Sequence, residues 1–573
     1  MSSTVASYLD SIPVLPALVA AHPTIAKTVG AIALLVLGVY IYLFPYREAT
    51  LTFRNLRGPA RTSLVWGNLG EIIKAPPCGK HDEWIAEYGH TIRYTMMFGE
   101  SRIVTTDPVA LGFILQHSYD FIKPERTNQF LERMLGNGVL TAEGEVHRRQ
   151  RRVLNPAFGP AAIRDMSPVF YDKAYELQRK FNTFIEDEAA ADADVTSPTP
   201  AKDVDRVPGA RKIDIMRYLG QTTLDVIGVA GFNYDFKTLS ERRNPLAEAF
   251  NAMFQSGTRI TALGILQNFF PILDFIKTKQ TRVVKASRDK TIQIGNEIVD
   301  EKKKAIRELG SVEKDSDLGN DLLGRLMKAN MAPDLRPEQK LTDAEVLAQI
   351  TTFMLAGNET TSTALTWCLY RLAQYQHYQD RLRDEIRAVG EEQPSEAVVN
   401  ALPFLDKIVH ESLRLDSPVP GTIRMANKDM VVPFGTPVQG RDGKMIDSVL
   451  LKKGVHVFMP ILTTNHATDI WGADAAEFNP DRYSREGIPK EQIPGVTYGN
   501  LLTFIGGARN CIGYRFALAE MKVILYVLIR SFKFDLLKSN PEYERKAQIV
   551  MRPRVVGEED AGLQMPLLVS VAE

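Results

Sequence analysis

The pattern of apolar and polar positions changes several times along this 573-residue chain. An uncharged apolar run covers Thr28 to Phe44, and residues 92–106 then alternate in the manner of strands. Helical patterns follow, the clearest from Thr342 to about Tyr375 and from Tyr514 to Phe532. Phe532-Lys533-Phe534 alternates again. The pattern predicts an apolar N-terminal helix, a small β region, a series of helices and a β-rich end.

The first apolar run is predicted to be a membrane anchor. Its 17 residues are close to the roughly 20 that a membrane-spanning helix needs. A cleaved signal peptide is the alternative, but the N-terminus lacks a basic start and a clear cleavage site. Arginines follow the run, which places the rest of the chain in the cytoplasm by the positive-inside rule. We expect a lumenal segment over residues 1–27, a single-pass anchor over residues 28–46 and one large domain over residues 47–573.

Composition adds three constraints. The chain has 69 basic and 69 acidic residues, so a bulk attraction to nucleic acid is not indicated. Its three cysteines, Cys78, Cys368 and Cys511, are far apart and odd in number, which argues against a disulfide framework and fits a reducing compartment. Residues 186–211 are rich in Ala, Asp, Pro and Ser without an apolar period, which predicts a flexible insertion.

Cys511 is the main candidate for chemistry. It lies in a glycine-rich loop, residues 504–513, directly before a predicted helix. Free N–H groups at a helix N-terminus favour a thiolate, and the glycines allow backbone to approach the sulfur. An exposed thiolate would oxidise, so we expect a large group such as a metal cofactor to cover it. A buried structural cysteine is the alternative interpretation.

A second candidate lies inside the longest apolar helix. Thr342 and Glu345 form a capping-box pattern at its start, and Glu359-Thr360 falls within it. A carboxyl group in so apolar a helix is costly without a partner or a task, and beside a hydroxyl it can move protons. The alternative is a glutamate held in a salt bridge and a threonine bonded to its own i−4 carbonyl.

These candidates match a known family. Phe504, Gly507, Arg509, Cys511 and Gly513 fit the pattern F-x-x-G-x-R-x-C-x-G, which resembles the heme-binding loop of the cytochrome P450 family. The resemblance spans about residues 55–560 and implies the mainly α P450 fold with a small β domain. It implies that Cys511 is the axial thiolate ligand of iron in heme b.

The resemblance also assigns other residues. Glu359 and Thr360 match the family's acid–threonine motif, which delivers protons during oxygen activation. Glu411-x-x-Arg414 and Arg482 match a buried triad that is structural and takes no part in chemistry. The implied cofactor-binding residues are Cys511, Phe504, Arg509, Arg424, Arg151 and His147, the last in place of the family's usual tryptophan. For Arg424, a surface turn at Pro418–Arg424 is the alternative.

The implied function is monooxygenation of a small apolar substrate, such as a terpenoid, steroid, fatty acid or xenobiotic. The chain lacks a dinucleotide or flavin fingerprint, so electrons from NADPH are expected through a separate cytochrome P450 reductase, with cytochrome b5 as a second candidate donor. The resemblance points to a fungal enzyme of secondary metabolism in the endoplasmic reticulum membrane, with its catalytic domain in the cytosol. A reductase-independent isomerase or dehydratase and a heme-thiolate sensor without turnover are the rival functions.

Two further segments have two interpretations each. The arginines of Gly144–Arg152 are either a solvated face or a docking patch for an acidic electron-transfer partner. Ile260–Ile276 is apolar and interrupted by Gly264 and Pro271. By family position it is the roof of the substrate pocket at the membrane, and by pattern alone it is a core helix.

Overall fold

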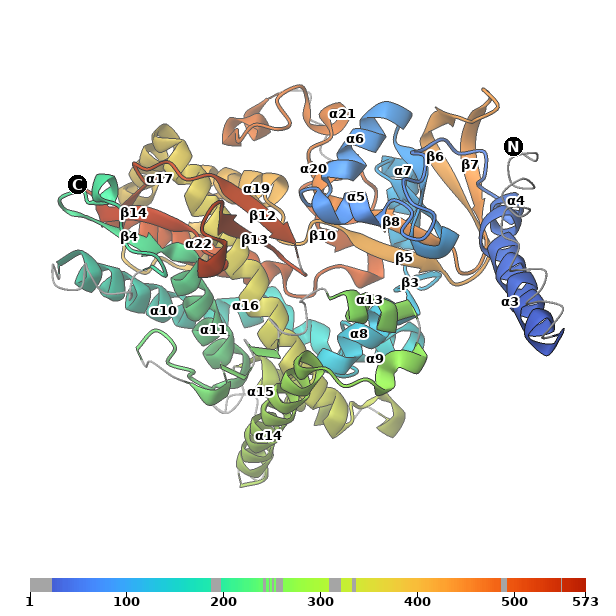
Figure 1. The fold of residues 1–573 in the computed structure, drawn as a ribbon. Coiled ribbons are helices and arrows are strands. Elements are labelled where there is room, and N and C mark those ends of the chain that lie inside the picture. The colour runs from blue at the N-terminus through green and yellow to red at the C-terminus, as the bar shows by residue number, and fades with distance from the viewer. Residues whose placement is uncertain are drawn as a thin grey trace.

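The computed structural model is mainly helical, with small sheets that lie in separate parts of the molecule (Figure 1). It describes residues 23–186, 197–240, 244–246, 248–249, 252–253, 261–269, 271–308, 321–331, 336–485, 492–547 and 549–573.

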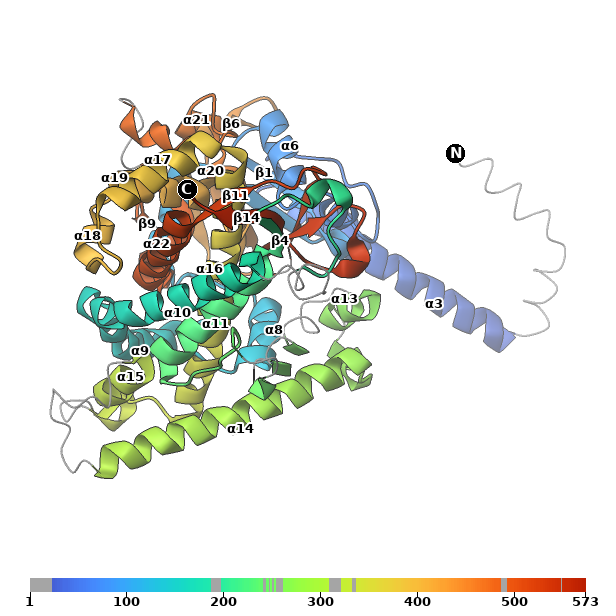
Figure 2. The same cartoon turned by 90° about the vertical axis from the view of Figure 1, so that its left-hand side faces the viewer.

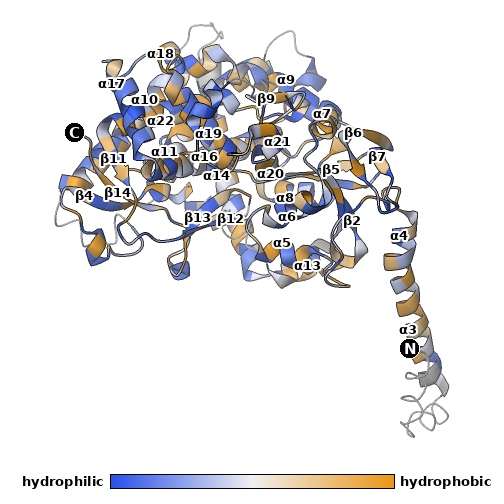
Figure 3. Ribbon diagram, turned by 90° about the horizontal axis from the view of Figure 1, so that it is seen from above, coloured by the Kyte–Doolittle hydropathy of each residue, from blue (hydrophilic) through white to orange (hydrophobic). Residues whose placement is uncertain are grey.

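The apolar N-terminal run forms a helix that extends away from the body (Figure 2) and is apolar over most of its length (Figure 3). α3 (Pro23–Ile41) continues through a π-helical turn at Tyr42–Tyr46 into α4 (Arg47–Thr50). Pro45 lies in this turn, where its missing N–H loosens the helical ladder. Lys27–Thr50 is long and apolar enough to cross a membrane, and its most apolar window is fully exposed. A signal sequence would meet the same criterion, so the helix is a candidate anchor. Residues 1–22 of the expected lumenal segment lie outside the described residues.

The largest sheet joins segments from both ends of the chain. Its strand order is β1 (Thr91–Thr95), β2 (Ser101–Thr105), β8 (His456–Met459), β5 (Thr422–Ala426) and β3 (Phe121–Ile122). β1 and β2 are antiparallel, which confirms the strands predicted within residues 92–106, and only β2 and β8 run parallel.

Four helices form the core beside this sheet: α10 (Pro160–Glu186), α11 (Ile215–Phe232), α16 (Asp343–Gln374) and α22 (Tyr514–Ser531). Both hydrogen bonds of the predicted capping box start α16, which is 32 residues and roughly 50 Å long. α16 packs on α11 at Gly357, where a Cβ would lie 3.0 Å from the side chain of Ile227. Glycine therefore sets the close approach of these two helices.

The remaining helices surround this core. They are α5 (Leu69–Lys74), α6 (Gly79–Tyr88), α7 (Pro108–Gln116), α8 (Glu125–Leu135), α9 (Gly144–Leu154), α13 (Ala262–Phe269), α14 (Lys279–Glu308), α15 (Leu322–Met331), α17 (Gln376–Ala388), α18 (Glu396–Asn400), α19 (Pro403–Leu415), α20 (Ile461–Asn465) and α21 (Thr468–Trp471).

The other strands form one three-stranded sheet and three strand pairs. The sheet has the order β11 (Phe532–Asp535), β14 (Pro566–Val571) and β4 (Ala210–Asp214), which confirms β structure from Phe532 onward. The pairs are β6 (Met430–Gln439) with β7 (Met445–Leu451), β9 (Val496–Tyr498) with β10 (Leu501–Gly506), and β12 (Tyr543–Ala547) with β13 (Met551–Val555).

The predicted flexible insertion is only partly tested. Residues 187–196 lie outside the described residues. Residues 197–211, by contrast, make ordered contacts: the Asp205 carboxylate accepts two hydrogen bonds of 2.8 Å from Ser539, and β4 begins at Ala210. Polar composition thus concealed a strand that pairs with β14, and the flexibility expected for this segment stays a prediction.

Candidate functional site

Cys511 lies where β10 turns into α22. The chain passes through a 3-10 turn at Gly507–Arg509, and the Cys511 N–H donates to the Phe504 carbonyl over 2.9 Å. Gly507 has a φ of +65°, and a Cβ there would lie 2.0 Å from the Leu115 carbonyl oxygen. Only glycine therefore fits this point of the loop. The turn holds Cys511 three residues before Tyr514, the first residue of α22, so the cysteine directly precedes this helix as the sequence predicts.

The surroundings of Cys511 differ from those of the other two cysteines. All three are free thiols, but Cys78 and Cys368 are buried whereas Cys511 keeps an exposed surface. Burial by the surrounding chain raises the pKa of the Cys511 thiol, while the Gly513 N–H and the positive charge of Arg151 lower it. An open face in dense surroundings suits a sulfur that binds a ligand, and a bound metal ion would stabilise its thiolate.

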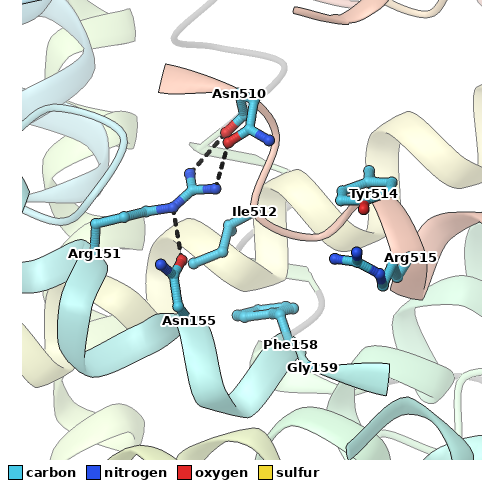
Figure 4. A pocket seen from close by; sticks show the side chains of 8 residues that line it. All are labelled: Arg151, Asn155, Phe158, Gly159, Asn510, Ile512, Tyr514 and Arg515. Carbon is cyan, nitrogen blue, oxygen red and sulfur yellow. Dashed lines mark hydrogen bonds between the residues drawn. The ribbon is translucent and has the colours of Figure 1, made fainter. Parts of the chain in front are cut away.

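Arg151 and His147 share α9 but have different surroundings. Arg151 donates to the Asn510 carbonyl and side chain over 2.7 and 2.6 Å, and to Asn155 over 2.8 Å (Figure 4). It thus braces the residue before Cys511. His147 is buried beside the Tyr119 hydroxyl, and burial with nearby cations lowers its pKa to about 3, so it is neutral.

A cluster of cations lies behind the loop. The Arg509 guanidinium donates to the Ala142 carbonyl over 2.6 Å and to the Glu143 carboxylate. Burial and the charge of Arg509 lower the pKa of Arg424 to about 10, and its guanidinium bonds only to its own strand within the described residues. Burial, Arg424 and Arg509 lower the pKa of Lys123 to about 7. Arg424, Arg509 and Lys123 thus repel one another, and among these contacts Glu143 is the single carboxylate that offsets their charge.

This excess of positive charge is a test of whether heme fits the site. Buried cations depress one another's pKa unless an anion joins them, and heme carries two carboxylates. Arg424, Arg509 and Lys123 therefore form a donor set suited to those carboxylates. Arg151, which bonds to Asn510, and Arg509, which bonds to Glu143, both have protein partners, so the predicted role of Arg151 stays a prediction. Lys123 was missed from the sequence because it follows a two-residue strand and belongs to no motif.

Glu359 and Thr360 lie near the middle of α16. The Thr360 hydroxyl donates to the Ala356 carbonyl over 2.6 Å. Ala356, one turn earlier on the same face, is exposed and Thr360 is half-buried. Glu359 is buried and forms an ion pair with Arg552 of β13. Both contacts of the structural alternative are therefore present, and Arg552 is a partner that no sequence motif indicated.

The three residues of the predicted structural triad are brought together and are fully buried. Arg414 donates two hydrogen bonds of 2.8 Å to Glu411, one to each carboxylate oxygen, and Arg482 adds one of 3.3 Å. The remaining guanidinium N–H groups bond to backbone carbonyls between Asn465 and Glu477 and to Asp474. This network fastens the end of α19 to the segment Asn465–Glu477, which precedes β9 and β10.

Comparison with known proteins is consistent across the chain. The sequence profile of the cytochrome P450 family matches residues 57–556. Cytochrome P450 monooxygenases 128 and 205 of Postia placenta are each 41% identical to this chain; the matches cover 92% and 91% of it and 94% and 93% of those proteins. Cytochrome P450 monooxygenase claW of Ampulloclitocybe clavipes is 33% identical, over 90% of this chain and 93% of its own.

Proposed function

This chain belongs to the cytochrome P450 family and is related to fungal monooxygenases, and from that premise we propose that it inserts one oxygen atom into a small apolar substrate. The observation that carries the proposal is the exposed Cys511 at the start of α22, in front of an excess of buried cations. A thiolate on one side and carboxylate-binding cations on the other match the donor set of a heme-thiolate enzyme.

The chain's own residues would have separate tasks around heme b. Cys511 would supply the axial thiolate, and Arg424, Arg509 and Lys123 would bind the carboxylates. Phe504 holds the loop through its carbonyl, which accepts the Cys511 N–H. His147, neutral and paired with Tyr119, supports the cluster from behind. Heme supplies the activation of oxygen, and the protein orients the substrate and delivers protons.

The test of this proposal is spectroscopic. Reduced protein with carbon monoxide should show the red-shifted Soret band of thiolate ligation, and Cys511→Ala should lose it. Cys78→Ala is the matched control, because that thiol is buried against the Pro420 carbonyl and should leave the band unchanged. Heme binding without that band in the wild-type protein would contradict the proposal.

Proton delivery is the task proposed for Glu359 and Thr360. Thr360→Ala should consume NADPH and release peroxide with little product, because the proton path to the reacting oxygen is interrupted. Ser362→Ala is a suitable control, since its hydroxyl makes the same kind of i−4 hydrogen bond, to Asn358, over 2.8 Å. Full coupling of NADPH to product in Thr360→Ala would contradict the role.

Electron supply through a separate NADPH-dependent reductase is supported by the surface around Arg151. A cavity of about 440 Å³ there is bordered by the exposed Arg515 (Figure 4). An adjoining cavity of about 750 Å³ is bordered by the exposed Arg148 and Arg152. Charge reversal at Arg152 or Arg515 should slow reduction about tenfold at low salt. The same change at the exposed Lys453 of the β7–β8 connection should have little effect. Equal rates in all three would contradict docking here.

A single-pass position in the endoplasmic reticulum membrane is supported by more than α3. Ile272 and Phe275, after α13, are 80% and 74% exposed, and Trp66 and Ile73 are also exposed. Figures 2 and 3 show α13 on the side from which α3 extends. Exposed apolar side chains of this size fit a lipid surface better than water. Flotation of the full chain with vesicles, compared with a chain that lacks residues 1–46, tests the anchor.

The substrate itself would be identified by profiling the products that the enzyme forms with reductase across apolar substrates.

A further inference from the structure

The C-terminal hairpin β12–β13 lies along α16 (Figure 1). The Trp367 indole N–H donates to the Met551 carbonyl over 2.9 Å, and the Arg545 guanidinium stacks on the Trp367 ring at 5.3 Å. One turn further on, the rings of Tyr370 and Tyr543 meet edge to face at 5.2 Å. The hairpin is therefore packed against more than one turn of the helix that carries Glu359.

The backbone at the start of β13 is fixed from two sides. The Met551 N–H donates to the Pro418 carbonyl over 2.7 Å, while its own carbonyl accepts the Trp367 indole. On the neighbouring strand, Arg545 pairs with Asp416, which is fully buried. Arg552 follows Met551 directly, so its Cα is fixed relative to both α16 and the segment that begins at Pro418.

The Arg552 side chain reaches back across the interface to Glu359. Both residues are buried, and within the described residues Arg552 is the only charge that lowers the pKa of Glu359, which burial raises. Glu359 bonds through one carboxylate oxygen. The contact is thus a single attachment between a rigid strand and the acid next to Thr360.

We propose that Arg552 is the positioning residue for the proton relay. From the hairpin, its guanidinium binds the Glu359 carboxylate of α16 and thereby controls the position and the protonation of the acid that passes a proton to Thr360. The inference rests on the relay role proposed for Glu359. A carboxylate paired with a guanidinium carries no proton. Glu359 must therefore take a proton from water and leave Arg552. It then passes that proton to the Thr360 hydroxyl oxygen while the hydroxyl gives its own proton to the reacting oxygen, and Glu359, ionised again, returns to Arg552 as a carboxylate.

Three variants separate positioning from simple stability. Arg552→Gln removes the charge, and Arg552→Lys keeps the charge but loses the planar donor geometry of guanidinium. Arg554→Gln is the matched control, because Arg554 lies two residues along the same strand and pairs with Glu544 of β12. All three are made in the full-length heme protein.

The first measurement is infrared absorption of the carboxylic-acid carbonyl at pH 7. Without Arg552, burial alone acts on Glu359, so Arg552→Gln should gain a protonated carboxyl band. This additional band, measured as a difference from the wild-type spectrum, should be absent from the Arg552→Gln/Glu359→Gln double variant, from Arg552→Lys and from Arg554→Gln. Its absence from Arg552→Gln would overturn the inference.

The second measurement is the solvent deuterium isotope effect on NADPH oxidation with reductase, as a function of pH. Arg552→Gln should change the pH profile and lower the rate by about 10²-fold, because a misplaced proton donor forfeits its geometric advantage. Arg552→Lys should recover part of the rate. A profile identical to that of Arg554→Gln would also overturn the inference. If the wild-type protein lacked the thiolate band with carbon monoxide, the proposed function itself would fail, whatever the infrared result.

Discussion

Two buried glutamates of this protein, Glu411 and Glu359, both lie on helices and both face an arginine, yet their surroundings are opposite. Glu411 accepts from Arg414 through both oxygens, from the Asn479 N–H over 2.9 Å, from Arg482 and from the Tyr483 hydroxyl over 3.0 Å. These donors lower its pKa in spite of burial. The carboxylate is thus held as a permanent anion.

Glu359 accepts from one side chain, Arg552, through one oxygen within the described residues. Burial outweighs that single donor, and the pKa of Glu359 is raised. A carboxylate with every lone pair engaged is a fixed structural part, whereas one with a single donor can exchange its partner and its proton. The number of donors therefore separates the structural acid from the candidate catalytic acid better than burial or the presence of an arginine does.

The largest expected effect comes from Glu411→Gln. Donors face both carboxylate oxygens, so the amide NH2 must meet a donor in either orientation and two buried guanidiniums lose their anion. We expect a loss of about 3–5 kcal/mol in the free energy of unfolding. Denaturant unfolding of the full chain measures it. Asp481→Asn, which breaks a surface pair with Arg381, should cost under about 1 kcal/mol. A similar small cost at Glu411 would break the comparison.

Glu359→Gln should have a smaller effect on stability. Only one oxygen of Glu359 is engaged, so the amide can turn its oxygen toward Arg552 and keep a neutral hydrogen bond. We expect a loss of about 1–3 kcal/mol, measured by the same unfolding experiment. A loss equal to that of Glu411→Gln would mean that Glu359 is as strongly fixed as the structural acid.

The sequence predicts the features that depend on local spacing and does not predict those that depend on contacts between distant segments. The Cys511 loop, the capping box at Thr342 and the Glu411–Arg414 pair are local, so their spacing fixes their geometry. Lys123 could not be identified, because it joins its partners only when distant strands meet. The same holds for Arg552, which lies 193 residues from Glu359.

Arg151 shows the limit of spacing even within one helix. Its i,i+4 relation to His147 on α9 was predicted correctly, yet spacing does not say what a long side chain reaches. Its guanidinium engages Asn510 and Asn155. The apolar segment Ile260–Ile276 is similar: its pattern allowed a core helix, but Ile272 and Phe275 are exposed. Residues 260 and 270 lie outside the described residues.

The pH dependence of stability should distinguish the two acids. Glu411 has a lowered folded-state pKa, so its contribution is fully present above the unfolded value of about 4.3 and is lost only as pH falls through the folded pKa. Glu359 has a raised folded-state pKa, so its contribution is present below about pH 4.3 and is lost as pH rises through the folded pKa.

Between about pH 5 and 8 the stability difference between wild type and Glu411→Gln should therefore be constant. The free energy of unfolding of the wild type should decrease relative to that of Glu359→Gln as pH rises, by at most about 1.4 kcal/mol per pH unit. Thermal unfolding across that range measures both. Where Glu411→Gln does not fold, Tyr483→Phe, which removes one donor, provides the reference. A stability difference that changes with pH for Glu411→Gln but not for Glu359→Gln would reverse the assignment of Glu411 as the structural acid and Glu359 as the candidate catalytic acid.

Glu520 on α22 extends the comparison to an acid with no donor, and its substitution should have the smallest effect. Neither carboxylate oxygen has a hydrogen-bond partner within the described residues, and the nearby Thr361 hydroxyl also lacks one there. Burial raises the pKa of Glu520 well above its usual value, and Thr361 opposes this only in part. Glu520 is therefore held as a neutral acid.

A neutral acid and an amide have similar shape and no charge, so Glu520→Gln should change the free energy of unfolding by about 1 kcal/mol or less near pH 6. Because a raised folded-state pKa removes stability as pH rises, the variant should become the more stable protein toward alkaline pH. Thermal unfolding of both proteins over the same pH series measures this. Glu520→Met, which is apolar and similar in size, should behave like the glutamine variant. A large loss in either variant at every pH would show that an ionised Glu520 has a partner, and the order of five donors, one and none would no longer explain the three acids.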